Sequence, residues 1–288
     1  IIVVGGGHAG IEAALAGARL GAATVLITHA RSEIGRMPCN PAIGGLGKGH
    51  LVREIDVLGG EMGRVIDRTG IQFRILNRRK GPAVRAPRAQ ADKHRYQAAM
   101  LHAVEDQDGL RVVEGDVVGL ETAEDGGRPR VVGVRLAAGH VIHGRHVILC
   151  TGTFLRGLMH VGERRTTGGR EGAASSEGLS PDLRRLGLEL RRLKTGTPPR
   201  LAADSIDTTR LEAQDGDEDA RPFSFRTRDF CPASHRCWLA YTNARTHGII
   251  RDNLHRSPLH VGVIDGLGPR YCPSIEDKIV RFADRDRH

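Results

Sequence analysis

The sequence lacks several features that define whole classes of protein. No hydrophobic run reaches the ~18 residues that a membrane span needs, and we expect no secretory signal peptide. Only five cysteines are present, scattered and odd in number, which excludes a dense disulfide framework and indicates a reducing, cytoplasmic setting. Aromatic residues make up only 3% of the chain, so the core must consist mainly of Val, Leu, Ile and Ala.

Glycine and arginine, by contrast, are abundant. The 288 residues include 38 glycines, which favours an α/β protein of roughly two domains with many tight turns. The net charge is +9, and arginine dominates the cations, which indicates a polyanionic partner such as nucleic acid. A general arginine bias is the alternative explanation. The chain begins on a strand, without methionine, and ends on a charged run, so we expect a fragment.

A dinucleotide-binding fingerprint opens the chain. The apolar run Ile1–Val4 is followed by GGGHAG, which puts Gly5, Gly7 and Gly10 in the G-x-G-x-x-G register. An Ala-rich helical stretch and the strand TVLIT complete a βαβ unit, in which the helix amides receive a pyrophosphate. The acid that usually ends the second strand is missing. A hydroxyl, a backbone group or Glu33 is left to bind the ribose.

A later segment favours FAD over NAD as the tightly bound cofactor. Short strands are expected at 110–118 and 130–136, with a turn between them, and at 146–150. The last of these runs into Thr-Gly. A strand ending in this way, after a small β insertion, is typical of flavoproteins with two dinucleotide-binding domains.

Cys39 lies in the loop PCNPAIGGLGKGH, which has too much Pro and Gly to form a helix or a central strand. Such loops bring backbone close to a ligand, so the thiol is a candidate for chemistry. A second Cys-Pro pair occurs at Cys272. We expect a helix to begin at Pro273 and to run to Phe282, with Ser274–Asp277 capping its first turn. Both pairs being simple bends is the alternative. The GKG sequence is not a phosphate-binding P-loop, because Ala42 and Gly49 stand where the pattern requires Gly and Ser or Thr.

Three further segments carry expectations. The stretch 71–92 is basic and bent by Pro and Gly, which suits phosphate binding or a solvated surface. A helix is expected over 183–193, followed by a candidate ligand loop, KTGTPPR, at 194–200. Residues 202–229 are acidic and are expected to be a surface excursion of the second domain. The C-x5-C spacing of Cys231 and Cys237 argues against a metal site, and we expect none.

Five long sequence words then coincide: GGGHAG, CNPAIGG-x-GKGHL, GIQFRILN-x-x-KGPAVRA-x-RAQAD, RLKTGTPPR and GPRYCPSIEDK. Running in this order over nearly the whole chain, they resemble the MnmG (GidA) family of FAD-dependent tRNA uridine-34 modification enzymes. The folate- and FAD-dependent tRNA uridine methyltransferase TrmFO is related, but it matches these words less well.

The resemblance implies an α/β fold, with a Rossmann-like FAD-binding domain of the glutathione-reductase type and an inserted second α/β domain. The first portion of the FAD domain, with a small β insertion, is expected at residues 1–155, and the inserted domain at 156–288. The family's return segment to the FAD site and its C-terminal helical domain are expected to be absent from this chain.

The resemblance also implies a function. The family forms (carboxymethyl)aminomethyl groups at C5 of the tRNA wobble uridine with FAD, NADH and methylenetetrahydrofolate. It works with the GTPase MnmE, which docks on the missing helical region, and we expect a cytoplasmic homodimer with no membrane contact. TrmFO-like methylation, a non-catalytic flavin-containing RNA-binding scaffold and a plain NAD-dependent oxidoreductase remain rival hypotheses.

Site residues follow by matching the family's words. Cys39 and Cys272 are the expected catalytic thiols, one of which adds to uracil C6. The expected FAD contacts are Gly5, Gly6, Gly7, His8, Ala9, Gly10, Val117 and Ser176. The expected tRNA contacts are Arg74, Arg78, Arg79, Lys80, Arg85 and Arg88. The expected NAD segment comprises Gly268, Pro269, Arg270, Tyr271, Cys272, Pro273, Ser274, Ile275, Glu276, Asp277, Lys278, Ile279, Val280, Arg281 and Phe282.

Overall fold

A four-stranded parallel sheet organises the first part of the chain. The computed structural model describes residues 1–37, 39–264, 266, 268 and 273–288. The sheet has the order β10-β1-β2-β6. Its strands are β1 (Ile2–Val4), β2 (Thr24–Thr28), β6 (Leu110–Glu114) and β10 (Val147–Leu149). The predicted βαβ unit is confirmed, with α1 (His8–Arg19) connecting β1 to β2.

Each face of this sheet is covered by a different kind of layer. Val3 and Leu26 point to α1 and α4 (Lys93–Glu105), whereas Ile2, Val4 and Ile27 belong to the core on the other face. That second core is closed by an antiparallel meander. Its strands are β7 (Val117–Asp125), β8 (Arg128–Leu136) and β9 (Val141–His143). Helices on one face and a β-meander on the other confirm the expected α/β class.

A second, three-stranded sheet is formed by strands that lie in the sequence between β2 and β6. It has the order β3-β5-β4 and is formed by β3 (Ala42–Gly44), β5 (Ala86–Ala91) and β4 (Gly70–Leu76). Two helices precede β4, namely α2 (Lys48–Val57) and α3 (Met62–Thr69). Phe73 and Ala89 of this sheet join the same core as α1 and α4. The strand carrying the Cys39 loop is therefore built onto the dinucleotide-binding unit.

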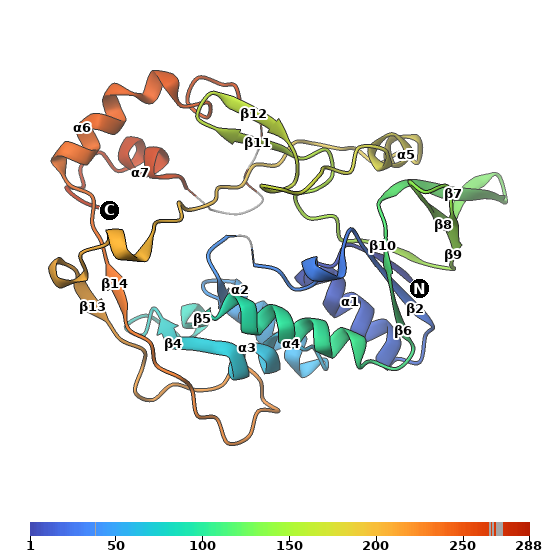
Figure 1. The fold of residues 1–288 in the computed structure, drawn as a ribbon, viewed down its shortest axis with the longest axis horizontal. Coiled ribbons are helices and arrows are strands. Elements are labelled where there is room, and N and C mark those ends of the chain that lie inside the picture. Colours follow the sequence, from blue (N-terminus) through green and yellow to red (C-terminus); the bar gives the residue numbers. More distant parts are fainter. Residues whose placement is uncertain (38, 265, 267, 269–272) are drawn as a thin grey trace.

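The remaining elements form smaller units. They are the hairpin β11 (Leu158–Val161) with β12 (Arg164–Thr167), α5 (Leu179–Arg185), the pair β13 (Glu212–Gln214) with β14 (Cys237–Leu239), α6 (Ala244–Asp252) and α7 (Ile275–Arg281). Figure 1 shows α6 and α7 at one end of the molecule and the β7–β9 meander at the other. No helix within the described residues is long and apolar enough to cross a membrane.

Two sequence-based expectations about the second half are wrong. The helix expected at 183–193 overlaps only the end of α5, which ends at Arg185 with Leu186 as its C-cap, because Gly187 takes a left-handed φ of +84°. The acidic stretch 202–229 is not only a surface excursion. Phe223 is buried in the first core at 1% exposure, and its amide donates a 2.7 Å bond to Asp67 of α3. The domain boundary near residue 155 stays a prediction. The segment 202–229 follows that boundary in the sequence, yet its Phe223 packs into a core whose other buried residues all precede the boundary.

Asp56 and Asp67 hold that segment in place. Asp67 accepts the amides of Phe223 and Ser224, and Asp56 accepts the amide of Phe225 at 2.8 Å. Burial is the main reason why the pKa of Asp67 is raised. Burying Phe223 contributes roughly 1.5–3 kcal/mol. Its ring also fills the space where a side chain at Gly44 would lie, which ties the Cys39 loop to this segment.

Candidate functional site

The turn after β1 is shaped by three glycines with different surroundings. A Cβ at Gly5, where φ is +113°, would overlap the Cys150 carbonyl, and a Cβ at Gly10 would overlap the Gly5 carbonyl. Both residues are therefore required by close packing. Gly7 differs, because no atom of the described residues lies within 4 Å of the position its Cβ would take. The backbone at Gly7 is open to a ligand.

Gly7 is also the N-cap of α1, and no side chain caps the helix there. The amides of the first turn, at His8, Ala9 and Gly10, therefore form the kind of site that receives a pyrophosphate. Burial lowers the pKa of His8, which favours the neutral form of its ring. Its Nε2 is buried without a hydrogen-bond partner among the described residues. This arrangement fits a dinucleotide such as FAD.

Val117 and Ser176, expected as FAD contacts, meet at the same edge of the parallel sheet. The Ser176 hydroxyl lies 3.1 Å from the Val117 carbonyl and 3.1 Å from the Asp116 carboxylate. His29, directly after β2, places Nε2 3.4 Å from Asp116. Ligands of parallel sheets bind beyond the carboxyl ends of the strands, which is where these residues and Gly5 lie.

Glu33, a candidate for ribose binding, is already engaged. It lies on the short 3₁₀ turn Arg31–Glu33 and forms ion pairs with Arg170 and Arg36. Arg170 is only 13% exposed, and its guanidinium lies 5.4 Å from the centre of the Phe154 ring. Sequence reasoning missed Arg170, since nothing in its local sequence links it to residue 33.

Cys39 is held between two segments that are distant in sequence. Its loop is fixed to the β5 end because the Ala91 amide donates a 2.6 Å bond to the Pro41 carbonyl. On the other side, the Cys39 Sγ lies 3.8 Å from the Gly196 carbonyl. Arg200 donates a 2.5 Å bond to the Cys39 carbonyl. The thiol, which is partly buried, is thereby brought to the KTGTPPR loop.

The KTGTPPR loop in turn contacts α7. Lys194 Nζ lies 3.4 Å from Asp277 Oδ2. Asp277 also completes the capping box with Ser274 that begins this helix, so the cap predicted from the sequence is confirmed. Burial alone would raise the pKa of Asp277, but the Ser274 amide and the Lys194 ammonium together lower it. Three of the five sequence words thus meet around residues 194–200.

The second expected catalytic cysteine is Cys272. Cys272 lies outside the described residues, as do Pro269, Arg270 and Tyr271 of the expected NAD segment. Gly266, Gly268 and the residues from Pro273 onward are described. A Cβ at Gly266 would lie 3.4 Å from the Arg192 carbonyl, and Asp277 contacts Lys194. The catalytic role of Cys272 therefore rests on the sequence.

The six basic residues expected to bind tRNA do not form one group. Arg78 is paired with Asp217 at 3.0 Å and with Asp219, so its charge is largely compensated. Those acidic partners, 139 or more residues later in the chain, had no signal in the sequence. Arg79, Lys80 and Arg85 are exposed on the loop, whereas Arg74 and Arg88 lie on β4 and β5 and are partly buried.

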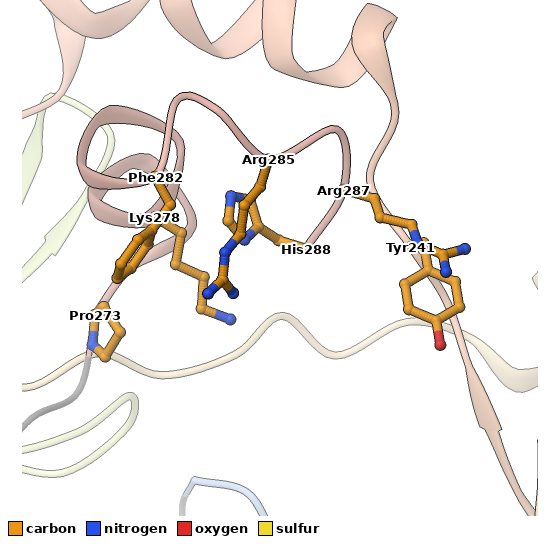
Figure 2. A pocket seen from close by; sticks show the side chains of 7 residues that line it. All are labelled: Tyr241, Pro273, Lys278, Phe282, Arg285, Arg287 and His288. Atoms are coloured by element: carbon orange, nitrogen blue, oxygen red, sulfur yellow. The ribbon is translucent and has the colours of Figure 1, made fainter.

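A pocket of about 450 Å³ opens beside α7 (Figure 2). Three of its lining residues, Pro273, Lys278 and Phe282, belong to the expected NAD segment. The others are Tyr241, Arg285, Arg287 and His288. Arg285 lies 4.9 Å from the centre of the Phe282 ring, and Arg287 lies 4.4 Å from that of Tyr241. Cations beside aromatic rings suit a ligand with phosphates and a flat base.

Comparison with known proteins gives consistent matches over the full chain. The family model described as Glucose inhibited division protein A matches residues 1–288. The tRNA uridine 5-carboxymethylaminomethyl modification enzymes MnmG of Geobacter sulfurreducens and Nitratiruptor are 59% and 55% identical. Each match covers all of this chain but only 45% and 46% of the relative.

Solved structures agree. Aquifex aeolicus GidA in its form I crystal superimposes with a TM-score of 0.91 at 51% identity, covering 100% of this chain and 48% of that one. The form II crystal gives a TM-score of 0.89. The chain spans about half the length of the relatives it matches. It belongs to the GidA (Glucose inhibited division protein A) family.

Proposed function

We propose that this chain is the flavin- and thiol-bearing part of an enzyme that modifies C5 of the tRNA wobble uridine, U34. The whole protein forms (carboxymethyl)aminomethyluridine with FAD, NADH, methylenetetrahydrofolate and an amine, which is glycine or ammonium. It acts as a cytoplasmic homodimer with the GTPase MnmE. The observation that carries this proposal is the junction of Cys39 with the KTGTPPR loop, on the same molecule as an open dinucleotide-binding turn.

The FAD assignment is supported by the fit of the residues. Gly7 leaves room for the pyrophosphate, and the uncapped amides of α1 donate to it. Val117 and Ser176, at the carboxyl edge of the sheet, would contact the bound cofactor there. When bound, FAD supplies the redox step of the modification. The chain's part is to position the cofactor beside the thiol and the uridine.

The chemical step asks for a nucleophile at uracil C6. A thiolate of Cys39 or Cys272 adds to C6, which makes C5 nucleophilic. C5 then bonds to the methylene carbon of methylenetetrahydrofolate as the electrons of one of that carbon's C–N bonds pass to the folate nitrogen. Loss of the C5 proton and expulsion of the thiolate then restore the ring. Cys39 is suited to this because its loop is fixed on both sides, so its sulfur is held while the base approaches.

NADH is the proposed reductant, and the α7 pocket is its proposed site. Lys278 and Arg285 offer charge to the pyrophosphate, while Phe282 and Tyr241 offer faces for a base (Figure 2). Of the described part of the segment Gly268–Phe282, three residues line the pocket. The assignment of the rest of that segment to NAD rests on its resemblance to the family's sequence.

The test is to map the modified nucleotide. The gene is deleted in its native host and replaced by the whole protein or by an empty vector, and tRNA digests are analysed by mass spectrometry. The proposal expects the (carboxymethyl)aminomethyl group at U34 only with the gene present. A methyl group at another uridine would support the TrmFO-like alternative instead, and unchanged tRNA in the presence of flavin would support the scaffold alternative.

A further inference from the structure

Arg74 and Arg88 face each other across two neighbouring strands. They are directly opposite in the antiparallel register of β4 and β5. Opposed residues of such a pair share one face of the sheet, with Cβ atoms about 5 Å apart, and like charges in this position destabilise the pair. Phe73 and Ala89, their neighbours in sequence, point to the core on the other face. The Arg74 and Arg88 side chains therefore leave the sheet on the same face, opposite the core.

Neither arginine has its charge compensated by the part of the chain that the structure describes. No carboxylate lies within ion-pair distance of Arg74 or Arg88 there, in contrast to Arg78 with its two aspartates. Arg74 Nε is buried without a hydrogen-bond partner among the described residues. Gln90 follows Arg88 on the same face of β5. Its Oε1 is also buried without a hydrogen-bond partner among the described residues.

This face adjoins the Cys39 loop. β3 flanks β5 on the side away from β4, with Gly44 opposite Arg88. The Pro41 carbonyl of the Cys39 loop accepts the Ala91 amide, three residues from Arg88 on β5. Three residues of an extended strand span about 10 Å. An anion held by both arginines would therefore lie roughly one nucleotide's reach from the loop that carries the thiol.

We propose that Arg74 and Arg88 form a binding site for one phosphate group, namely a phosphodiester next to the uridine that the enzyme modifies. This inference rests on the proposed function. Two forked guanidinium groups bind one phosphate through several charge-assisted hydrogen bonds. The bound phosphate also removes the repulsion between them. The other basic residues of the segment contribute only general attraction to RNA.

The experiment pairs a change in the protein with a change in the RNA. The whole protein is tested with a synthetic anticodon stem-loop RNA, in which single phosphodiesters around the target uridine are replaced by neutral methylphosphonates. For the parent protein, one such replacement weakens binding about tenfold. Arg74→Gln and Arg88→Gln bind the unmodified RNA about tenfold less tightly, and that same methylphosphonate then costs them nothing further. Arg111→Gln, at an exposed position of β6 outside the expected RNA contacts, is the matched control; it loses little affinity and remains sensitive to the neutral linkage.

Stability and rescue separate a phosphate site from a merely structural role. Removing one of two opposed charges should raise the melting temperature of the RNA-free protein or leave it unchanged. Arg88→Lys should recover part of the RNA affinity, because it restores the charge without the fork. A fall in melting temperature with unchanged RNA binding would overturn the proposal, since it would reveal a purely structural role for the arginine.

Other outcomes are equally decisive. Equal methylphosphonate penalties in Arg88→Gln and in the parent would overturn the phosphate site, as would loss of flavin with intact RNA binding, which would assign the arginines to the cofactor. If a variant fails to fold, the methylphosphonate series with the parent protein still tests the proposal. If no single neutral linkage weakened binding to the parent, there would be no such phosphate site. A parent that binds no anticodon RNA would instead contradict the proposed function itself.

Discussion

Arg200 donates a 2.5 Å hydrogen bond from Nη2 to the main-chain carbonyl of Cys39, a residue 161 positions earlier in the chain. The bond joins two loops that contain too much Pro and Gly to order themselves. Because it acts on the backbone of Cys39, it sets where the thiol lies without contacting the sulfur. We regard Arg200 as a positioning residue for the proposed chemistry.

Replacing Arg200 should affect catalysis more than folding. Arg200→Gln removes one hydrogen bond at an exposed site, so the free energy of unfolding should fall by no more than about 1 kcal/mol. The thiol loses its fixed position, so kcat for uridine modification should fall about tenfold while KM for tRNA changes little. Steady-state kinetics and thermal unfolding of the whole protein measure both.

Arg191→Gln is the matched control for that variant. Arg191 lies shortly before the KTGTPPR loop, is exposed and, among the residues that the structure describes, pairs with nearby Glu189 alone, at 2.8 Å. Its loss should change neither kcat nor stability measurably. Equal kinetic defects in the two variants would mean that the Arg200–Cys39 bond has no special part in positioning.

Two glycines of the fingerprint, Gly10 and Gly7, should respond differently to replacement by alanine, one in stability and the other in FAD affinity. Gly10→Ala places a methyl group against the Gly5 carbonyl, so it should cost about 1–3 kcal/mol of stability or more even without flavin. Gly7→Ala meets open space, so it should leave the flavin-free protein intact yet weaken FAD binding at least tenfold. Thermal unfolding and flavin fluorescence titration separate these effects. An unchanged FAD affinity in Gly7→Ala would contradict the placement of the pyrophosphate.

The Lys194–Asp277 pair should make part of the stability pH-dependent. Because the folded pKa of Asp277 is lowered, its contribution is present above the ordinary pKa of 3.8 and is lost as pH falls through the lower folded value. Lys194→Met should therefore reduce stability by about 0.5–1 kcal/mol at pH 7, and the difference from the parent should shrink towards pH 3. Urea unfolding at a series of pH values measures this, and a difference that does not change with pH would argue against the ion pair.

The α7 pocket yields a prediction about the reductant. Arg285→Gln and Lys278→Gln each remove a cation from its lining, so each should weaken NADH binding about tenfold without changing FAD content. Titration of the whole protein with NADH, followed by fluorescence, provides the readout. Arg251→Gln, on exposed α6, serves as the control. NADH affinity that stays at the parent's level in both pocket variants would move the reductant elsewhere.

Local features of this molecule could be predicted from the sequence. The βαβ unit follows from an apolar strand, a glycine turn and an Ala-rich helix that are contiguous in the chain. The Ser274 cap of α7 follows from four adjacent residues. The helix expected at 183–193 failed because its apolar spacing continues past Gly187, whose left-handed backbone ends α5.

The long-range arrangement carried no such signal. Asp67 and the Phe223 amide are 156 residues apart, and neither residue has a periodic pattern that points to the other. Arg78 likewise looked like a free cation until Asp217 and Asp219 were found beside it. The Cys39 loop and KTGTPPR were each recognisable as ligand loops, but their contact depends on tertiary packing that no local propensity encodes.

The most direct test of the account is a single comparison in cells that lack the native gene. The whole protein is supplied as parent, as Cys39→Ser or as Cys231→Ser, whose cysteine is exposed and outside the site. Flavin absorbance is measured on each purified protein, and U34 is analysed by mass spectrometry of tRNA digests. We predict normal flavin in all three, full modification with the parent and Cys231→Ser, and none with Cys39→Ser. Full modification of U34 by Cys39→Ser would contradict the central claim that this loop carries a reacting thiol.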